Sequence, residues 1–254
     1  MKVVILCGGK GARMKEVTDD MPKPLAMIGG KPILWHIMKL YEYYGFNEFI
    51  LLLGYKGDKI KEYFMDYRWK NHDFILDNNT GKIHLLQQPE NWKITFIDTG
   101  LNTMTGSRIK KVQNYIEDET FMLTYGDGVG NVNIKNLLKF HREKGRSATV
   151  TGIVKKSQYG TLTVKNDIAE SFQEKSEING IINGGFFVLN KKVFQYLRDD
   201  DNCIFEQAPL MNLAKNNELA VYPHQGMWMA MDTYKDLLVA NEIFEEDKKS
   251  WRVW

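Results

Sequence analysis

Short apolar runs alternate with amphipathic segments in the first half of the chain. The runs 2–7, 49–53 and 121–125 contain few polar residues, which is typical of strands buried on both faces of a parallel sheet. Apolar residues recur with helical spacing in 33–44 and 58–67, between the first two runs and just after the second. Strand, helix, strand, helix in this order predicts an α/β fold in which helices cover both faces of a mostly parallel sheet.

The same patterns predict further elements along the chain. We expect strands at 74–76, 83–86, 94–97, 148–154, 161–164, 186–189, 220–222 and 227–231, and helices at 109–115, 133–144, 191–197, 204–215 and 233–245. Segment 99–108, before the helix at 109–115, is rich in glycine and threonine. The sequence contains no internal repeat or linker-like stretch, which favours a single domain over 1–254.

Composition narrows the classes of function. A net charge of +2 on 254 residues indicates neither a nucleic-acid partner nor a membrane surface. The two cysteines, Cys7 and Cys203, are typical of reduced thiols in a cytosolic protein. The apolar runs are too short for a signal peptide or a membrane span. We therefore expect a cytoplasmic protein.

A glycine-rich basic loop follows the first predicted strand. It contains three glycines and three basic side chains: Gly8, Gly9, Gly11, Lys10, Arg13 and Lys15. Without a Cβ, the glycine backbone can adopt positive φ and approach a ligand closely, and successive N–H groups there can bind an anion. Further along, Pro22 and Pro24 restrict the backbone on both sides of Lys23. The arrangement predicts a binding site for a nucleoside triphosphate.

Two better-known phosphate-binding motifs do not fit this loop. The chain has no G-x-x-x-x-G-K-[ST] string, and the G-x-G-x-x-G pattern starting at Gly9 meets Met14 where the last glycine is required. A flexible turn with solvated charges therefore remains an alternative interpretation of the loop alone.

Two aspartates follow predicted strands. Ligands of open α/β sheets lie outside the carboxyl ends of the strands, where we expect the first loop and Asp127 to lie. Asp232 follows another strand-like run, and two carboxylates together with phosphate oxygens suit Mg²⁺. The alternative is that each aspartate caps a turn or a helix. Sequence spacing does not show whether Asp127 and Asp232 meet.

Other chemistries have no support in the sequence. The five histidines form neither H-E-x-x-H nor a Cys/His zinc pattern, and the chain has no G-x-S-x-G nucleophile motif.

The loop and the lysine together resemble the sugar-phosphate nucleotidyltransferases. That family's signature, a strand followed by GGxGTRL and then PKPL, stands here as 8–14 and 22–25. Within the family the chain is similar to the glucose-1-phosphate cytidylyltransferases. The supporting strings lie at 28–38, 54–57, 98–100, 104–106, 124–129, 171–175, 182–190 and 231–233, in order over nearly the whole chain.

The resemblance implies a fold, a reaction and a set of contacts. It implies a Rossmann-like, GT-A-like mixed sheet with a nucleotide-binding core at 1–130 and 223–254 and an acceptor half at 131–222. It implies an Mg²⁺-dependent reaction of CTP with a phosphorylated acceptor, glucose 1-phosphate, that yields CDP-glucose and pyrophosphate for polysaccharide synthesis. It also implies a homo-oligomer, for which a hexamer is one form.

The residues carried over from the family fall into four groups. The nucleotide would contact Leu6, Cys7, Gly8, Gly9, Lys10, Gly11, Ala12, Arg13, Lys23, Thr103, Arg108 and Gly126. The acceptor would lie near Tyr159, Gly160, Glu174, Lys175 and Asn183. Mg²⁺ would bind Asp127 and Asp232, and Lys23, Arg13 and Asp127 would be the catalytic residues.

Several positions depart from the family pattern. They are Ala12, Tyr159, Ser176, Phe205 and Ala208, and most of them lie in the acceptor half. The alternative within the same chemistry is cytidylyl transfer to another phosphorylated acceptor, such as phosphoglutamine in capsule modification. A non-catalytic nucleotide-binding homologue is the alternative from a different class. It predicts loss of Lys23, Arg13 or the aspartates, which are all present.

Overall fold

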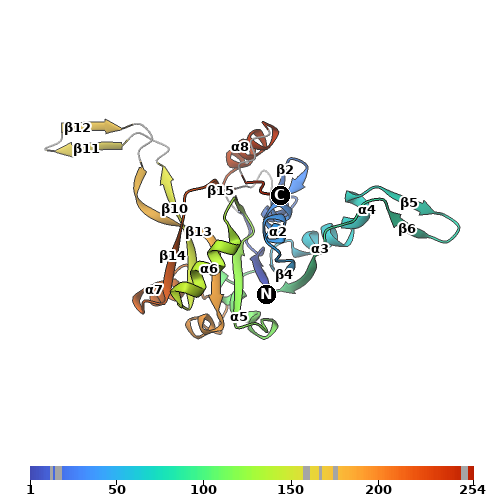
Figure 1. Cartoon of the computed structure of the whole chain (residues 1–254), viewed down its shortest axis with the longest axis horizontal. Coiled ribbons are helices and arrows are strands. Elements are labelled where there is room, and N and C mark those ends of the chain that lie inside the picture. Colours follow the sequence, from blue (N-terminus) through green and yellow to red (C-terminus); the bar gives the residue numbers. More distant parts are fainter. Residues whose placement is uncertain (12–13, 15–18, 157–160, 166–167, 174–176, 247–250) are drawn as a thin grey trace.

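The computed structural model describes residues 1–11, 14, 19–156, 161–165, 168–173, 177–246 and 251–254. For the described residues between 155 and 179, only the backbone is described. A seven-stranded sheet runs through the middle of the molecule, and two hairpins project from its opposite ends (Figure 1). Within the described residues, no helix is both long enough and apolar enough to cross a membrane.

The central sheet has the order β14-β10-β13-β8-β1-β4-β7. Its strands are β1 (Val3–Leu6), β4 (Glu48–Leu53), β7 (Lys93–Asp98), β8 (Thr120–Tyr125), β10 (Ala148–Lys156), β13 (Glu177–Asn190) and β14 (Leu219–His224). β8, β1, β4 and β7 are parallel neighbours, whereas β13 runs antiparallel to both β8 and β10. The mixed, mostly parallel α/β sheet confirms the predicted fold class.

Alternate residues of β1 enter two separate hydrophobic cores. Val3 and Ile5 belong to one core, and Val4 and Leu6 belong to the other. This follows from the alternation of side chains along a strand, and it explains why the run is apolar throughout.

Helices cover both faces of the sheet. One core is completed by α2 (Ile33–Tyr43), α6 (Ile134–Lys144) and α8 (Tyr234–Glu245). The other is completed by α5 (Thr105–Lys111), the 3₁₀ helix η4 (Lys191–Tyr196) and α7 (Ala208–Lys215). The remaining helices are η2 (Lys23–Leu25), α3 (Gly57–Met65), α4 (Tyr67–Asn71) and η3 (Gln113–Tyr115).

Four two-stranded ribbons complete the described structure. They pair β2 (Met27–Ile28) with β3 (Lys31–Pro32), β5 (Phe74–Asp77) with β6 (Lys82–Leu85), β9 (Gly128–Gly130) with β15 (Trp228–Ala230), and β11 (Thr161–Lys165) with β12 (Ile168–Gln173). The β5–β6 and β11–β12 ribbons are the two projecting hairpins (Figure 1).

Several element boundaries differ from the prediction. Helix α5 begins at Thr105, four residues before the predicted start, and the helix predicted at 109–115 is split into α5 and η3. The helix predicted from 204 begins only at Ala208. Both differences share one cause: the backbone around 203–205 hydrogen-bonds to the start of α5, through Cys203 N–H to Ser107 and Phe205 N–H to Thr105 (both 2.9 Å). Tertiary contacts here override local propensity.

Three further predictions need correction. The helix predicted at 58–67 breaks at Asp66 into α3 and α4, and the helix predicted at 191–197 is the 3₁₀ helix η4. Strand β13 is much longer than the predicted strand 186–189, and β12 was not predicted. The polar residues of 168–183 do not alternate regularly with apolar ones, so the pattern held no strand signal.

The chain end packs against α2 and α8. Trp251 is buried, and its indole N–H points to the imidazole of His36 (3.5 Å), whose other nitrogen faces the carbonyl of Ile28 (2.9 Å). Burial lowers the pKa of His36 to about 4. The side chain of Asn241 in α8 also accepts a hydrogen bond from the Gly29 N–H (3.0 Å). These contacts fix α8, which begins directly after Asp232 and Thr233.

Candidate active site

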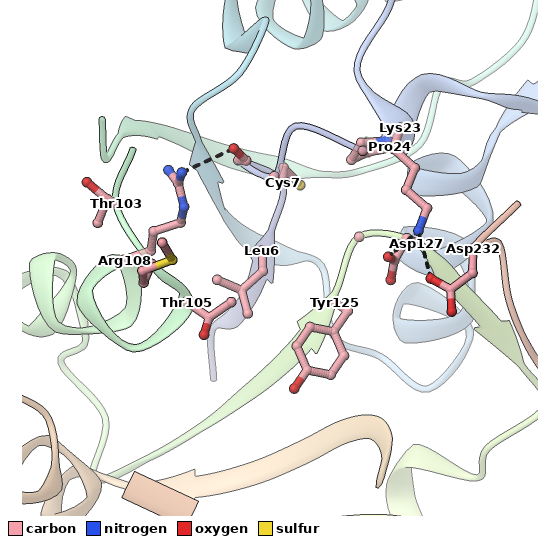
Figure 2. A pocket seen from close by; sticks show the side chains of 15 residues that line it. Leu6, Cys7, Lys23, Pro24, Thr103, Thr105, Arg108, Tyr125, Asp127 and Asp232 are labelled. Atoms are coloured by element: carbon pink, nitrogen blue, oxygen red, sulfur yellow. Dashed lines mark hydrogen bonds and ion pairs between the residues drawn. The ribbon is translucent and has the colours of Figure 1, made fainter. Parts of the chain in front are cut away.

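The loops that follow β1, β4, β7 and β8 meet at one edge of the sheet. These four strands are parallel neighbours, so their carboxyl ends lie together. Between the loops lies a pocket of about 360 Å³. It is lined by Leu6, Cys7, Gly8, Gly9, Gly11, Lys23, Pro24, Thr103, Met104, Thr105, Arg108, Tyr125, Gly126, Asp127 and Asp232. Figure 2 shows these side chains around the pocket.

Most residues predicted to bind the nucleotide line this pocket. Gly11 has a positive φ of 61°, as the prediction for the loop requires. Lys10 lies beside the pocket, and its ammonium group donates to the side chain of Asn102 (3.0 Å) on the loop after β7. Ala12 and Arg13 lie outside the described residues. Cys7 is buried, and burial raises the pKa of its thiol above the usual range.

Arg108 holds three of the four loops in place. Its side chain is buried, with 4% of the residue exposed. The guanidinium donates to five acceptors: the carbonyl oxygens of Gly8 (3.1 Å), Leu53 (2.9 Å), Gly100 (2.8 Å) and Leu101 (3.4 Å), and the hydroxyl of Thr99 (2.5 Å). These acceptors lie at the ends of β1, β4 and β7, and Figure 2 shows the bond to the first loop.

The Arg108 side chain explains why two nearby positions, Gly8 and Gly54, are glycine. A Cβ on Gly8 would lie 2.3 Å from an Arg108 nitrogen, and a Cβ on Gly54 would lie 2.5 Å from it. Both distances are shorter than any real contact, so a larger residue at either position would displace the guanidinium. The predicted direct contact of Arg108 with the nucleotide stays a prediction, because its donors here serve the loop backbones.

We expect Arg108→Lys to weaken both stability and nucleotide binding. An ammonium group cannot reach five acceptors spread over three loops, so buried carbonyl groups would lose their partners. The expected loss is about 2–3 kcal/mol of unfolding free energy, a fall in Tm of roughly 4–12 °C for a chain of this size. The KM for the nucleotide should rise about tenfold, at roughly 1.4 kcal/mol per factor of ten.

Thermal unfolding and initial-rate kinetics would check this prediction. The matched control is Arg198→Lys, because Arg198 is exposed and pairs only with Asp200 (2.9 Å) in the described structure. The Arg198→Lys variant should keep the wild-type Tm and the wild-type KM for the nucleotide. An Arg108→Lys protein with unchanged Tm and KM would contradict the role given to the guanidinium.

Lys23 lies between two carboxylates. Its ammonium group is 2.7 Å from Asp127 Oδ2 and 3.3 Å from Asp232 Oδ1. Only 11% of the Lys23 side chain is exposed, against 34% for Asp127 and 42% for Asp232. Figure 2 shows the Lys23 side chain pointing toward both aspartates, on the side of the pocket away from Arg108. The backbone of Lys23 is set by η2, which Pro22 caps and Pro24 continues.

The β9–β15 ribbon brings the two aspartates together. Asp127 directly precedes β9, Asp232 follows β15, and Gly128 pairs with Ala230 in antiparallel register. The Met231 N–H also donates to the Asp127 carbonyl oxygen (2.9 Å).

Asp232 is not the cap of the helix that follows it. The cap of α8 is Thr233, which forms a capping box with Asp236. The alternative interpretation of Asp232 as a helix cap is therefore wrong. Its carboxylate faces Lys23 instead.

The two carboxylates fit a divalent cation bound with phosphate. Both already converge on one cationic group, the Lys23 ammonium. Among the described residues, no group of three or more His, Cys, Asp or Glu side chains could hold a metal ion. A site with only two carboxylates suits an ion that takes its other ligands from water and phosphate, as Mg²⁺ does.

A second pocket of about 270 Å³ shares a wall with the first. Tyr125, Asp127 and Asp232 line both pockets. The other residues of the second pocket are Thr124, Gly128, Asn183, Gly184, Gly185, Phe186, Trp228 and Ala230. Among the residues predicted to bind the acceptor, Asn183 therefore lies beside the aspartates. Tyr159, Gly160, Glu174 and Lys175 lie outside the described residues.

Four residues of the first pocket were not predicted from the sequence. They are Pro24, Met104, Thr105 and Tyr125. Tyr125 ends strand β8 just before Gly126, and the position of a polar aromatic residue at a strand end beside a candidate aspartate was a usable signal. Met104 and Thr105 belong to the family-like string 104–106, but nothing in their residue types indicated a place in the pocket, which they reach through the early start of α5.

Comparison with known proteins agrees with this geometry. Residues 2–247 match the family model described as Nucleotidyl transferase. A probable glucose-1-phosphate cytidylyltransferase of Bacillus subtilis (strain 168) is 62% identical over 254 residues, with 100% of both chains covered. The glucose-1-phosphate cytidylyltransferase of Salmonella typhimurium is 44% identical over 258 residues, again with 100% of both chains covered.

Solved structures give the same result for the fold. Crystal structures of HddC from Yersinia pseudotuberculosis, one of them complexed with GMP-PN, superpose with TM-scores of 0.70 and 0.69 at 29% identity. The match covers 96% of this chain and 99% of theirs. The chain therefore belongs to the nucleotidyl transferase family, and it is similar over its whole length to members named glucose-1-phosphate cytidylyltransferases.

Proposed function

We propose that the chain transfers a cytidylyl group from CTP to α-D-glucose 1-phosphate, which yields CDP-glucose and pyrophosphate. One observation carries the proposal: Lys23, Asp127 and Asp232 converge where two pockets share a wall. A transfer between two phosphate groups needs a place where the phosphates of both substrates meet the same charged side chains. The printed names of the full-length relatives support the choice of nucleotide and acceptor.

The reaction is an in-line displacement. A phosphate oxygen of the acceptor attacks the α-phosphorus of CTP, a new P–O bond forms, and the bond to the β-phosphate breaks so that pyrophosphate leaves. No covalent intermediate on the protein is required. The protein's contribution is to hold the two phosphates in line and to offset their negative charge.

The role proposed for each residue follows from charge and position. The backbone of Gly8, Gly9 and Gly11 would hold the triphosphate. Lys23 would bind the α-phosphate and the incoming phosphate together, because its ammonium lies in the first pocket against the two aspartates that line both pockets. For Arg13 we propose, on the family resemblance, contact with the departing β- and γ-phosphates.

Mg²⁺ is proposed as the cation of the two aspartates. Asp127 and Asp232 would hold it, and when bound it would neutralise charge on the phosphates of CTP. The carboxylates offer two hard oxygen ligands, which is the number that Mg²⁺ takes from protein when phosphate and water supply the rest.

The remaining proposals rest on the family resemblance. We propose a single domain with the nucleotide core at 1–130 and 223–254 and the acceptor half at 131–222. We propose a cytoplasmic homo-oligomer that supplies CDP-glucose for cell-surface polysaccharide. Size-exclusion chromatography with light scattering would test the oligomer.

Pyrophosphate release with a panel of substrates tests the proposed function. CTP, UTP, dTTP and ATP would each be paired with glucose 1-phosphate, two other hexose 1-phosphates and phosphoglutamine, with and without Mg²⁺. We expect CTP with glucose 1-phosphate to give the highest kcat/KM, and no turnover without a divalent ion. Preference for another nucleotide would overturn the choice of CTP, and turnover of phosphoglutamine alone would overturn the choice of acceptor.

A further inference from the structure

A chain of hydrogen bonds runs from the first pocket to the second through Tyr125. The hydroxyl of Tyr125 donates to Glu206 Oε1 (2.6 Å) and accepts from the side-chain amide of Asn183 (3.2 Å). The other oxygen of Glu206 accepts from the Thr105 hydroxyl (2.6 Å). The residues come from β8, β13, α5 and the segment before α7, so only the tertiary structure brings them together.

The direction of these bonds is fixed at the Glu206 end. A carboxylate can only accept hydrogen bonds, so the Tyr125 hydroxyl must donate its single hydrogen to Glu206. The oxygen of Tyr125 is then left as an acceptor for Asn183, and it can pair only with the N–H₂ side of that amide. Burial and the adjacent Glu206 raise the pKa of Tyr125, so its hydroxyl keeps this proton at neutral pH.

Asn183 is held in one orientation by bonds on both sides of its amide. Its oxygen accepts from the Gly185 N–H (2.8 Å), and its nitrogen donates to Tyr125. An asparagine amide has two N–H groups and two acceptor positions, so one of each is left over in the described structure. Asn183 is exposed and lines the second pocket, where that donor and that acceptor can pair with a hydroxyl group.

We propose that Glu206 is a positioning residue for the acceptor. Through Tyr125, and together with the Gly185 N–H, it holds the orientation of Asn183, and so contributes to which hydroxyl of a sugar phosphate the second pocket accepts. The proposal rests on the proposed function and adds to it two residues, Glu206 and Tyr125, that set acceptor specificity through Asn183.

Glu206→Gln is the direct test. The side chain keeps its size, but its amide nitrogen can donate to Tyr125 and so reverse the direction of the bonds. We expect the KM for glucose 1-phosphate to rise about tenfold, the effect of one misdirected hydrogen bond. The KM for CTP should stay within about twofold, because the first pocket keeps Lys23 and the loops held by Arg108.

Discrimination between acceptor analogues is a measurement that a merely structural role of Glu206 would not change. Against a series of monodeoxy glucose 1-phosphates, the wild-type protein should reject the analogue that lacks the hydroxyl read by Asn183. Glu206→Gln should lose most of that discrimination. Tyr125→Phe should act in the same way, and the double variant should be no worse than either single one, since the residues act through one chain of bonds.

Glu218→Gln is the matched control. Glu218 also accepts two hydrogen bonds, from the backbone and the hydroxyl of Ser147 (both 2.8 Å), but neither pocket contains it. This variant should keep the acceptor KM of the wild type.

The outcomes separate this inference from the proposed function. Suppose that the wild type is active on glucose 1-phosphate. If Glu206→Gln then keeps the wild-type KM for the acceptor, or raises the KM for the acceptor and the KM for CTP equally, that result would overturn the positioning role alone. Additive effects in the double variant would do the same. A wild type that turns over no sugar phosphate would overturn both proposals.

Discussion

Replacing Lys23 with alanine is expected to lower kcat by about 10²–10³, the range seen when one preorganised electrostatic stabiliser is removed. The ammonium group is almost buried and lies within 3.3 Å of both aspartates, where the two pockets meet. Its loss would leave the reacting phosphates without a fixed cation. It would also leave Asp127 and Asp232 facing each other without the positive charge between them.

Pyrophosphate release at saturating CTP, acceptor and Mg²⁺ would measure the effect. Lys59→Ala is the control, because Lys59 is an exposed lysine that pairs with Glu62 (2.9 Å) on the surface of α3. It should keep the wild-type rate. A folded Lys23→Ala protein, verified by its melting curve, that releases pyrophosphate at the wild-type rate would remove Lys23 from the mechanism.

Asp127→Asn is expected to lower kcat by a similar factor, about 10²–10³. The change keeps the shape of the side chain but removes the charge that pairs with Lys23 at 2.7 Å and that would hold the divalent cation. We therefore also expect half-maximal activity to require more Mg²⁺, because only the Asp232 carboxylate would remain. Titration of Mg²⁺ at saturating CTP and acceptor would measure both effects.

Asp200→Asn is the control for the loss of one partly exposed carboxylate. Asp200 pairs with Arg198 (2.9 Å), and 44% of its side chain is exposed, against 34% for Asp127. Its replacement should change neither the rate nor the Mg²⁺ requirement. If Asp127→Asn kept the wild-type Mg²⁺ dependence as well as its kcat, the proposed metal site would be wrong.

The hydrophobic pattern was a good guide to the sheet and a poor guide to segments that depend on distant contacts. Strands such as β1 and β4 were predictable because both faces are buried, which makes the whole run apolar. The start of α5 was missed, because Thr105 begins a helix only where the backbone around Cys203 hydrogen-bonds to it. No local pattern carries that information.

The same division holds in the candidate site. Gly11 in the loop and Lys23 beside two prolines were recognisable because backbone freedom and restraint are local properties of the residues. The role of Arg108 was not recognisable, since its acceptors lie on three loops separated along the chain. From its own neighbours it is an ordinary basic residue just before the helix predicted at 109–115.

The α/β class, the glycine-rich loop after β1 and the restrained Lys23 were predictable, because they follow from residue type, periodicity and spacing over short stretches. The meeting of Asp127 and Asp232 depends on long-range folding, since the pairing of β9 with β15 joins segments about a hundred residues apart. The bonds from Glu206 through Tyr125 to Asn183 depend on it as well. Local preferences form the strands and helices, whereas strand pairing and packing determine which side chains share a pocket.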